Sequence, residues 1–298
     1  MKRTLWLVLL CCPLSLLSQK YLDLAKFSFA TTPENNFEDG PGSTTIQEWQ
    51  LRLQMPLPLG DQLVLLSGFT GNSNRLQPDP VSPGAVNLYA FSFELGLNQR
   101  FSETWGATFM VIPKFASDFN DSFKRGFQMA FLGLLTRTKS DNLNYSLGLY
   151  TNTEEYGLQI VPLLGAYYLS KDNRLEINML LPVLADIQYG LGEKTRLGMN
   201  FDGLGTSYAL NSPGFSNTYI NKSSNELFTY LQYAIQPSLL LRLKVGYAFF
   251  RAFKVYDEDD KISFSLSSIY FGDDRTVLNS GIQDGLIFKV SLLYRLHF

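Results

Sequence analysis

The sequence predicts an all-β protein, a transmembrane antiparallel up-and-down β-barrel of about 14 strands preceded by a signal peptide. Three observations predict this fold class. Segments of about ten residues or more alternate apolar with polar side chains, which is the pattern of membrane-spanning strands. An apolar N-terminal stretch follows two basic residues, and the chain ends on an aromatic residue, Phe298.

The composition excludes several classes of protein. Of the 298 residues, 45% are hydrophobic and 14% aromatic, which excludes intrinsic disorder. The formal net charge of −2 is not the basic balance that nucleic-acid binding requires, so we expect no nucleic-acid partner. Beyond the N-terminus, no window offers the roughly 18 consecutive apolar residues of a spanning helix.

The first element, residues 1–18, is predicted to be a secretory signal peptide. Lys2 and Arg3 form its positive region, a short apolar run follows, and Ser18 is a small residue at a suitable cleavage point. Cleavage after Ser18 leaves residues 19–298 as a single outer-membrane barrel domain.

Cys11 and Cys12 leave lipidation as an alternative to cleavage after Ser18. Against it, the residue before each cysteine is Leu10 or Cys11 rather than a small residue. Because both cysteines lie in the predicted signal peptide, the mature chain has no thiol for a disulfide or a metal site.

The barrel strands follow from alternation and length. In the second strand, Trp49, Leu51, Leu53 and Met55 alternate with polar residues. Soluble strands usually have about 5–6 residues, whereas a tilted strand needs about 9–11 to cross a bilayer. Only a closed barrel satisfies every backbone polar group in lipid. The predicted strands are 22–30, 45–55, 61–70, 86–98, 104–115, 125–137, 143–151, 157–170, 174–181, 183–190, 195–209, 224–236, 239–254 and 283–298.

The connections between these strands are of two kinds, as in bacterial outer-membrane barrels. Those after even-numbered strands are short and are predicted to be periplasmic turns, whereas most of those after odd-numbered strands are long. The long connections are 31–44, 71–85, 116–124, 210–223 and 255–282. The connection at Pro182 is nearly absent, and residues 261–271 alternate in part and could extend strands above the membrane. Twelve strands is therefore the alternative count.

The last strand carries a predicted assembly signal. Phe298, Leu296 and Tyr294 lie two residues apart on one face of this strand. A terminal aromatic residue on an amphipathic strand resembles the signal that the barrel assembly machinery reads, and we expect that machinery to be a partner.

Several stretches of the sequence carry a resemblance to a known family. They are Ala116-Ser117-Asp118-Phe119, Leu163-Leu164-Gly165-Ala166, 181–191 and 203–210. These stretches resemble domain of unknown function 6268, an uncharacterised family of outer-membrane barrels that is frequent in Bacteroidota. The resemblance covers most of the mature chain and implies the fold and a Gram-negative outer-membrane location. It implies no activity, because the motifs are structural spacings.

The sequence offers little for catalysis. His297, the one histidine, lies at the periplasmic end of the last strand, where a structural role is expected. No nucleophile elbow, P-loop or zinc-protease motif occurs, so we expect no enzyme, no cofactor and no metal site. Acidic clusters lie in the predicted outer loops but lack calcium-loop spacing, so we interpret them as solvated loops beside lipopolysaccharide. They are Glu38 with Asp39, Asp118 with Asp121, 257–260, and Asp273 with Asp274.

A set of charged residues is predicted to line the lumen, because Arg or Lys facing lipid at the midplane costs about 2–4 kcal/mol. The set is Glu48, Arg52, Glu94, Lys114, Arg137, Glu176, Asp186, Arg242, Lys244, Lys289 and Arg295. These residues either line a pore or form ion pairs that pack a narrow barrel shut.

Two functions stay open at this point. The first is a passive channel for small solutes in the bacterial outer membrane. The second is a non-conducting structural or surface-interaction barrel that acts through its outer loops. Early strands leave no room for an N-terminal plug, which disfavours an energy-coupled receptor.

Overall fold

The computed structural model describes residues 21–82, 84–120 and 125–297. The predicted signal peptide and Phe298 lie outside the described residues. Fourteen antiparallel strands form a closed barrel, in which β10 pairs with β11 and β1 pairs with β18. The predicted count of fourteen is thus confirmed, and the alternative count of twelve is wrong.

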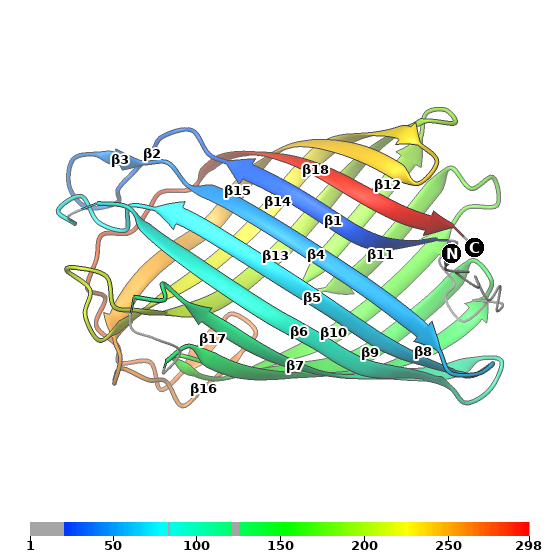
Figure 1. Cartoon of the computed structure of the whole chain (residues 1–298), viewed down its shortest axis with the longest axis horizontal. Coiled ribbons are helices and arrows are strands. Elements are labelled where there is room, and N and C mark those ends of the chain that lie inside the picture. The colour runs from blue at the N-terminus through cyan, green and yellow to red at the C-terminus, as the bar shows by residue number, and fades with distance from the viewer. Residues whose placement is uncertain (1–20, 83, 121–124, 298) are drawn as a thin grey trace, which may run out of the picture.

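The wall strands follow one another in chain order around the barrel (Figure 1). They are β1 (Tyr21–Thr31), β4 (Gln47–Pro58), β5 (Leu63–Leu76), β6 (Val86–Arg100), β7 (Trp105–Ser117), β8 (Phe127–Ser140), β9 (Leu143–Glu154), β10 (Gly157–Leu169), β11 (Leu175–Leu181), β12 (Leu184–Gly190), β13 (Thr195–Leu210), β14 (Thr218–Gln236), β15 (Leu239–Asp257) and β18 (Gly285–His297). Two short hairpins lie outside this wall. They are β2 (Asn35–Asn36) with β3 (Ser43–Thr44), and β16 (Phe264–Leu266) with β17 (Ile269–Phe271).

Alternation along the strands separates an apolar outer face from a polar inner face. Leu147 and Phe93 are 60% and 56% exposed on the outer face, whereas Gln128 and Asn152 on the inner face are buried. An outward apolar band with polar side chains inside is the arrangement of outer-membrane barrels. Among the described residues, no helix is long and apolar enough to span a membrane.

The two ends of the barrel differ in their connections. Tight turns join strands at the end where the described chain begins and finishes, and the long loops and both short hairpins lie at the opposite end (Figure 1). By the usual orientation, the turn end is periplasmic and the loop end is the outer end. Residues 261–271 form β16 and β17, so the partial alternation there predicted real strands.

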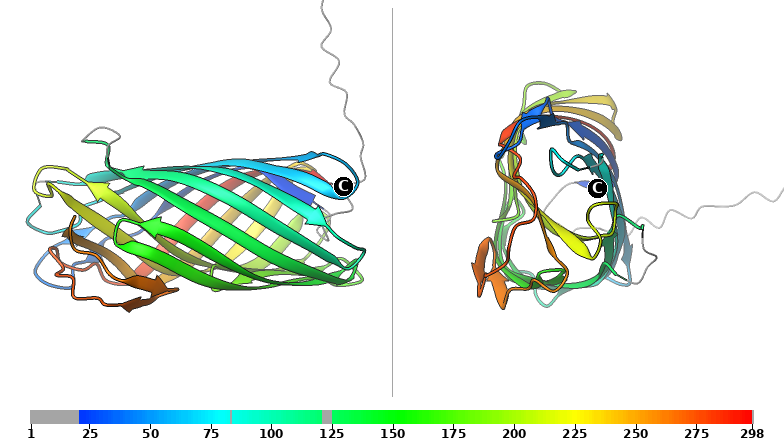
Figure 2. Two further views of the ribbon diagram at one scale, coloured as in Figure 1. Left: turned by 90° about the horizontal axis from the view of Figure 1, so that it is seen from below. Right: turned by 90° about the vertical axis from the view of Figure 1, so that its left-hand side faces the viewer.

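The outer parts of three strands leave the cylinder of the wall and bend into it. The β12–β13 ladder ends at Leu184 opposite Asp202, whereas β13 continues to Leu210 and there pairs with β7 through Ala209 and Ser117. Seen from the outer end, this segment crosses the ring of strands in yellow, while the orange β16–β17 hairpin lies outside the ring (Figure 2). We call residues 203–225 and 249–257, the inward-bent parts of β13, β14 and β15, the flap.

A β-bulge produces the bend in β15. Phe250 has a φ of 52°, and the register between β14 and β15 shifts between Ser223 and Asn225 at this place. The backbone nitrogens of Phe250 and Arg251 both donate to the carboxylate of Asp284, which fixes the bulge. A bulge inserts one residue and so exchanges the faces of the residues beyond it.

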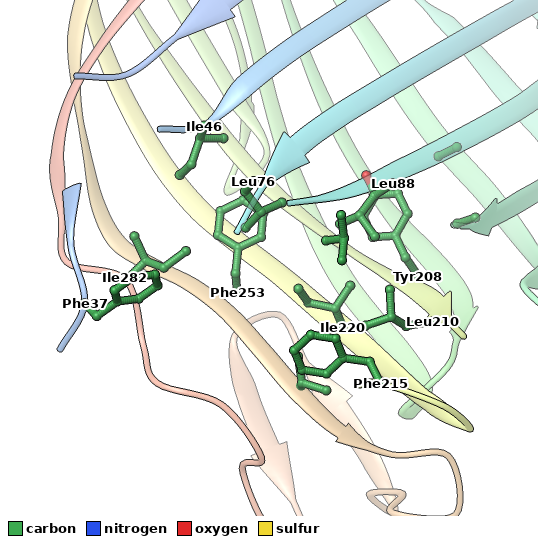
Figure 3. Close-up of a cluster of buried hydrophobic side chains, with 14 residues drawn as sticks. Phe37, Ile46, Leu76, Leu88, Tyr208, Leu210, Phe215, Ile220, Phe253 and Ile282 are labelled. Carbon is green, nitrogen blue, oxygen red and sulfur yellow. The ribbon is translucent and has the colours of Figure 1, made fainter. Parts of the chain in front are cut away.

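The flap carries the largest apolar core of the described chain. Phe253 from β15, Ile220 from β14, and Tyr208 and Leu210 from β13 point into one cluster (Figure 3). Val255 from β15 belongs to the same cluster. These residues pack against side chains from the inner faces of β5, β6 and β7 and from the outer loops. These are Phe37, Ile46, Leu76, Val86, Leu88, Ala90, Ala116, Phe215 and Ile282. The outer end of the barrel is therefore filled by apolar side chains.

Candidate functional site

The periplasmic half of the interior is hollow and polar. One cavity of about 240 Å³ is lined mainly by neutral polar side chains on β6 to β11, including Asn98, Thr108, Thr136, Asn144 and Ser146. A second cavity of about 230 Å³ faces the charged strands. Its lining includes Lys26, Arg52, Glu176, Asp186, Arg242 and Arg295. Each cavity has room for a small solute, below the roughly 300–1,000 Å³ of sites for larger ligands.

Ten of the eleven charged residues predicted to line the lumen point inward. Most of them lie in ion pairs, with nitrogen–oxygen distances from 2.5 to 3.7 Å. The pairs are Arg52–Glu94, Lys114–Glu154, Arg196–Glu176, Lys222–Glu48, Arg242–Asp186, Lys289–Glu226 and Arg295–Asp23. Lys244 donates to the Asn200 side chain. These pairs neutralise the interior, and the role of the ten residues in lining a conducting pore stays a prediction.

Arg137 is the exception, because its side chain lies on the outer face of β8. It shares the face of Phe131 and Leu135, and its guanidinium lies 5.6 Å from the ring centroid of the exposed Trp105. The prediction that Arg137 lines the lumen is therefore wrong. Alternation along β8 places Arg137 with the outward Phe131 and Leu135, and its charge does not decide its face. Near the end of its strand an arginine can lie at the membrane interface, where facing lipid costs little.

A buried polar cluster anchors the flap to the wall. The ammonium of Lys114 on β7 donates to Glu154 on β9 at 3.0 Å and to Thr206 on the flap. The backbone nitrogen and hydroxyl of Ser207 donate to the same carboxylate at 2.6 and 2.5 Å. The side-chain amide of Gln128 donates to the Ser207 carbonyl at 2.9 Å. Glu154 thus joins two wall strands to the flap.

Sequence analysis did not identify this anchor. Glu154 is separated from Lys114 by 40 residues and from Ser207 by 53 residues. No local spacing connects residues that far apart. The inward position of Glu154 could have been read from the alternation of β9, but its partners depend on the bend of the flap.

Two of the acidic residues of the outer loops, Asp118 and Asp273, bond to other residues of the protein, and Asp121 lies outside the described residues. Asp118 accepts from the Ser212 hydroxyl at 2.7 Å and the Asn211 backbone at 2.8 Å, and Asp273 pairs with Arg275 at 2.7 Å. Among the residues that the structure describes, no group of three or more aspartate, glutamate, histidine or cysteine side chains is arranged to hold a metal ion.

The predicted terminal residues lie at the periplasmic rim. Tyr294 is exposed on the outer face, Leu296 is half-buried, and Arg295 between them points inward onto Asp23. His297 is exposed and lies 3.1 Å from the Pro237 carbonyl oxygen.

Solved structures with similar folds are distant from this chain. The KdgM porin is 7% identical with a TM-score of 0.39, and the match covers 91% of this chain and 99% of the porin chain. The TodX monoaromatic hydrocarbon channel is 10% identical with a TM-score of 0.35, over 93% and 91% of the two chains. LpxR from Salmonella typhimurium is 9% identical with a TM-score of 0.35, over 90% and 99%. With TM-scores below 0.5, none of these similarities bears on activity or substrate.

Sequence comparison identifies the family. No curated protein sequence matches the chain. A family described as a domain of unknown function, DUF6268, matches residues 68–283, which run from β5 to the loop before β18. This match includes the flap, the anchor and most of the wall. The chain therefore belongs to the DUF6268 family of domains of unknown function.

Proposed function

We propose that this protein is an outer-membrane barrel that passes small solutes and that the structure is its closed form. The observation that carries the proposal is the contrast between the two halves of the lumen. The periplasmic half is hollow and polar, whereas the outer half is filled by the flap and its apolar core. A barrel with a purely structural role has no need of a polar vestibule behind a separate closing element.

The flap has the properties of a movable closure. Its β13 edge has left the wall ladder, and its attachment to β7 is a single bridged pair. The anchor is electrostatic and centres on one carboxylate, Glu154, and a second ion pair, Lys222–Glu48, also joins the flap to the wall. Removing one partner of a buried pair leaves an uncompensated charge, which is strongly destabilising.

The other roles of the chain follow from this proposal. We place the protein in the outer membrane of a Gram-negative bacterium such as a member of the Bacteroidota, inserted by the barrel assembly machinery. Its loops lie beside lipopolysaccharide, and the protein acts by passage rather than by catalysis. Supporting this, His297 is far from the outer loops and bonds to a turn carbonyl.

Conductance in planar bilayers tests the proposal. Glu154→Gln removes the charge that Lys114 and Ser207 share, and it should raise the open time or conductance at least fivefold over the unaltered protein. Glu34→Gln, an exposed loop carboxylate bonded to Ser43, is the matched control and should change neither. If neither the unaltered protein nor Glu154→Gln conducts while both are folded, the barrel is non-conducting and acts through its loops.

A further inference from the structure

The barrel wall is too short at one place. β11 and β12 have seven residues each, whereas a strand needs about 9–11 residues to cross a bilayer. Their hairpin turns at Pro182, so it reaches only the level of Leu164 on the neighbouring strand β10. Beyond that level, on the outer-leaflet side, β10 and β13 have no wall strand between them.

Beyond the β11–β12 hairpin, the facing edges of β10 and β13 are only partly paired with other strands. On β10, residues 161–163 lie between the ladder to β11, which begins at Leu164, and the ladder to β16, which ends at Ile160. On the other side, Gly203 donates its backbone N–H to the Val183 carbonyl, and Gly205 lies next to Gln159. We call this gap between β10 and β13 the seam.

Gly205 leaves open space at the seam. It is exposed although the flap lies inside the wall, and by alternation it shares the face of the lipid-facing Leu197 and Met199. A Cβ atom at Gly205 would approach only Gln159 Nε2, at 4.0 Å. Glycine within a strand often marks a place where a ligand or another backbone approaches closely.

A segment of the longest outer loop covers the upper part of the seam. We call residues 258–276, which include β16 and β17, the strap. Its β16 pairs in parallel with 158–160 on β10, and Ser267 donates its backbone N–H to the Ile160 carbonyl. The outer face of the strap is apolar and lies beside the outer end of β10. Its exposed side chains are Phe264, Leu266, Ile269 and Phe271.

A cation surrounded by tyrosines lies at the centre of the contacts between the strap and the flap. The guanidinium of Arg275 lies 4.3, 5.0 and 5.6 Å from the ring centroids of Tyr256, Tyr270 and Tyr156. Arg275 also donates to the Tyr219 hydroxyl at 3.2 Å and pairs with Asp273, and the pKa of that carboxyl is lowered by the hydrogen bond. The side chain of Arg275 is 1% exposed.

The two closures of the barrel differ in strength. The flap is held by a core of fourteen buried side chains and the Glu154 anchor. The strap is held by three ladder pairs on β10, by the contacts around Arg275, by the burial of Ile262 against three tyrosines, and by hydrogen bonds such as that from Asn221 to the Tyr270 hydroxyl. Because fewer apolar side chains are buried under the strap than in the flap core, displacing the strap is the smaller change, and it opens the seam while leaving the flap in place.

We propose that the seam is a lateral passage for small apolar or amphipathic molecules between the outer leaflet and the barrel interior, with the strap as its cover. Such molecules concentrate in the leaflet beside Phe264 and Leu266. They would pass the buried apolar side chains of Val161 and Leu163 on β10, and their polar ends would then meet the polar vestibule. This inference rests on the proposed transport function, to which it adds a second route and a class of substrate.

Locking the strap tests the inference. Leu158 and Phe264 are outward-facing ladder partners, so Leu158→Cys/Phe264→Cys can join the strap to β10 by a disulfide. The control, Leu158→Cys/Thr153→Cys, joins β10 to β9, which are already fully paired. The readout is uptake of the apolar dye N-phenyl-1-naphthylamine by intact Gram-negative cells. We expect the oxidised strap lock to lower uptake at least fivefold, reduction to restore it, and the control pair to change nothing.

A second pair of variants tests the seam without a disulfide. Gly205→Leu should fill the seam and lower dye uptake to the level of cells without the protein. Gly133→Leu, at a strand glycine whose Cβ would meet nothing within 4 Å, should leave uptake unchanged. If uptake exceeds that of cells without the protein and neither the lock nor Gly205→Leu reduces it, the lateral route is wrong. Arg275→Ala removes the cation at the centre of the strap contacts. If dye uptake with this variant and with the unaltered protein stays at the level of cells without the protein, the lateral route is also wrong. The proposed transport function is tested independently of dye uptake, by the conductance of Glu154→Gln in planar bilayers.

Discussion

At the residue scale, the face of a side chain is decided by alternation and not by its charge. Arg137 and Arg242 both lie in wall strands, yet Arg137 stacks on Trp105 outside while Arg242 pairs with Asp186 inside. Both arginines lie near the periplasmic ends of their strands. There an outward arginine can reach the membrane interface, whereas an inward one finds its partner in the lumen.

The first prediction compares two neighbouring residues on opposite faces of β9. Leu147→Arg places a cation in the apolar band and should destabilise the barrel by about 2–4 kcal/mol. Ser146→Arg adds the same charge, but it points into the cavity of about 240 Å³ and should fold. The folded fraction is measured as the heat-modifiable band on a gel of isolated outer membranes. Equal loss of folding in both variants would show that the interior is too tightly packed for this cavity to exist.

A second prediction concerns the buried pair of Lys222 and Glu48, whose charged atoms are 2.5 Å apart. Glu48→Met leaves the ammonium with Asn74 as its remaining bonded partner and should lower the free energy of unfolding by about 3–5 kcal/mol. The double variant Glu48→Met/Lys222→Met should recover most of this loss, because no charge then stays buried. Urea unfolding in lipid vesicles measures both. A double variant less stable than the single one would contradict the account of this pair.

At the element scale, the wall was predictable and the flap was not. Apart from β11 and β12, which have seven residues each, the wall strands follow from alternation and length, because each strand in lipid must bury polar side chains on one face only. In β15 the outward apolar residues occupy odd positions from Leu239 to Phe249, and Phe250 and Arg251 then break this alternation at the bulge. The partners that Phe253 reaches beyond the bulge depend on the bend of the strand, which the alternation does not predict. The anchor at Glu154 was missed for the same reason, because its partners depend on that bend.

The third prediction tests the orientation of the elements. Asp259→Cys lies on the exposed loop between β15 and β16, and Ser102→Cys lies on the exposed turn between β6 and β7. On intact cells an impermeant maleimide should label the first and not the second. Both natural cysteines lie in the predicted signal peptide, so the background should be clean. Labelling of Ser102→Cys alone would mean that the barrel is inserted the other way round.

At the scale of the whole molecule, the barrel consists of a hollow polar half and a filled apolar half. The flap makes this division, because it carries the apolar core across the lumen and leaves the cavities below it. The same bend takes β13 away from the wall where the short β11–β12 hairpin ends, and the seam that the strap covers lies there. Closure of the outer end and weakness of the wall therefore meet at β13.

The most direct test of this account ties the flap to the wall. Ser117 and Ala209 are buried ladder partners, so Ser117→Cys/Ala209→Cys can hold the flap on β7 by a disulfide. The measurement is the swelling rate of vesicles that contain the barrel, in isotonic arabinose, before and after reduction of the same sample. The account predicts at least tenfold faster swelling after reduction. Equal rates in the two states, whether fast or absent, would contradict the claim that the flap closes a passage for solutes.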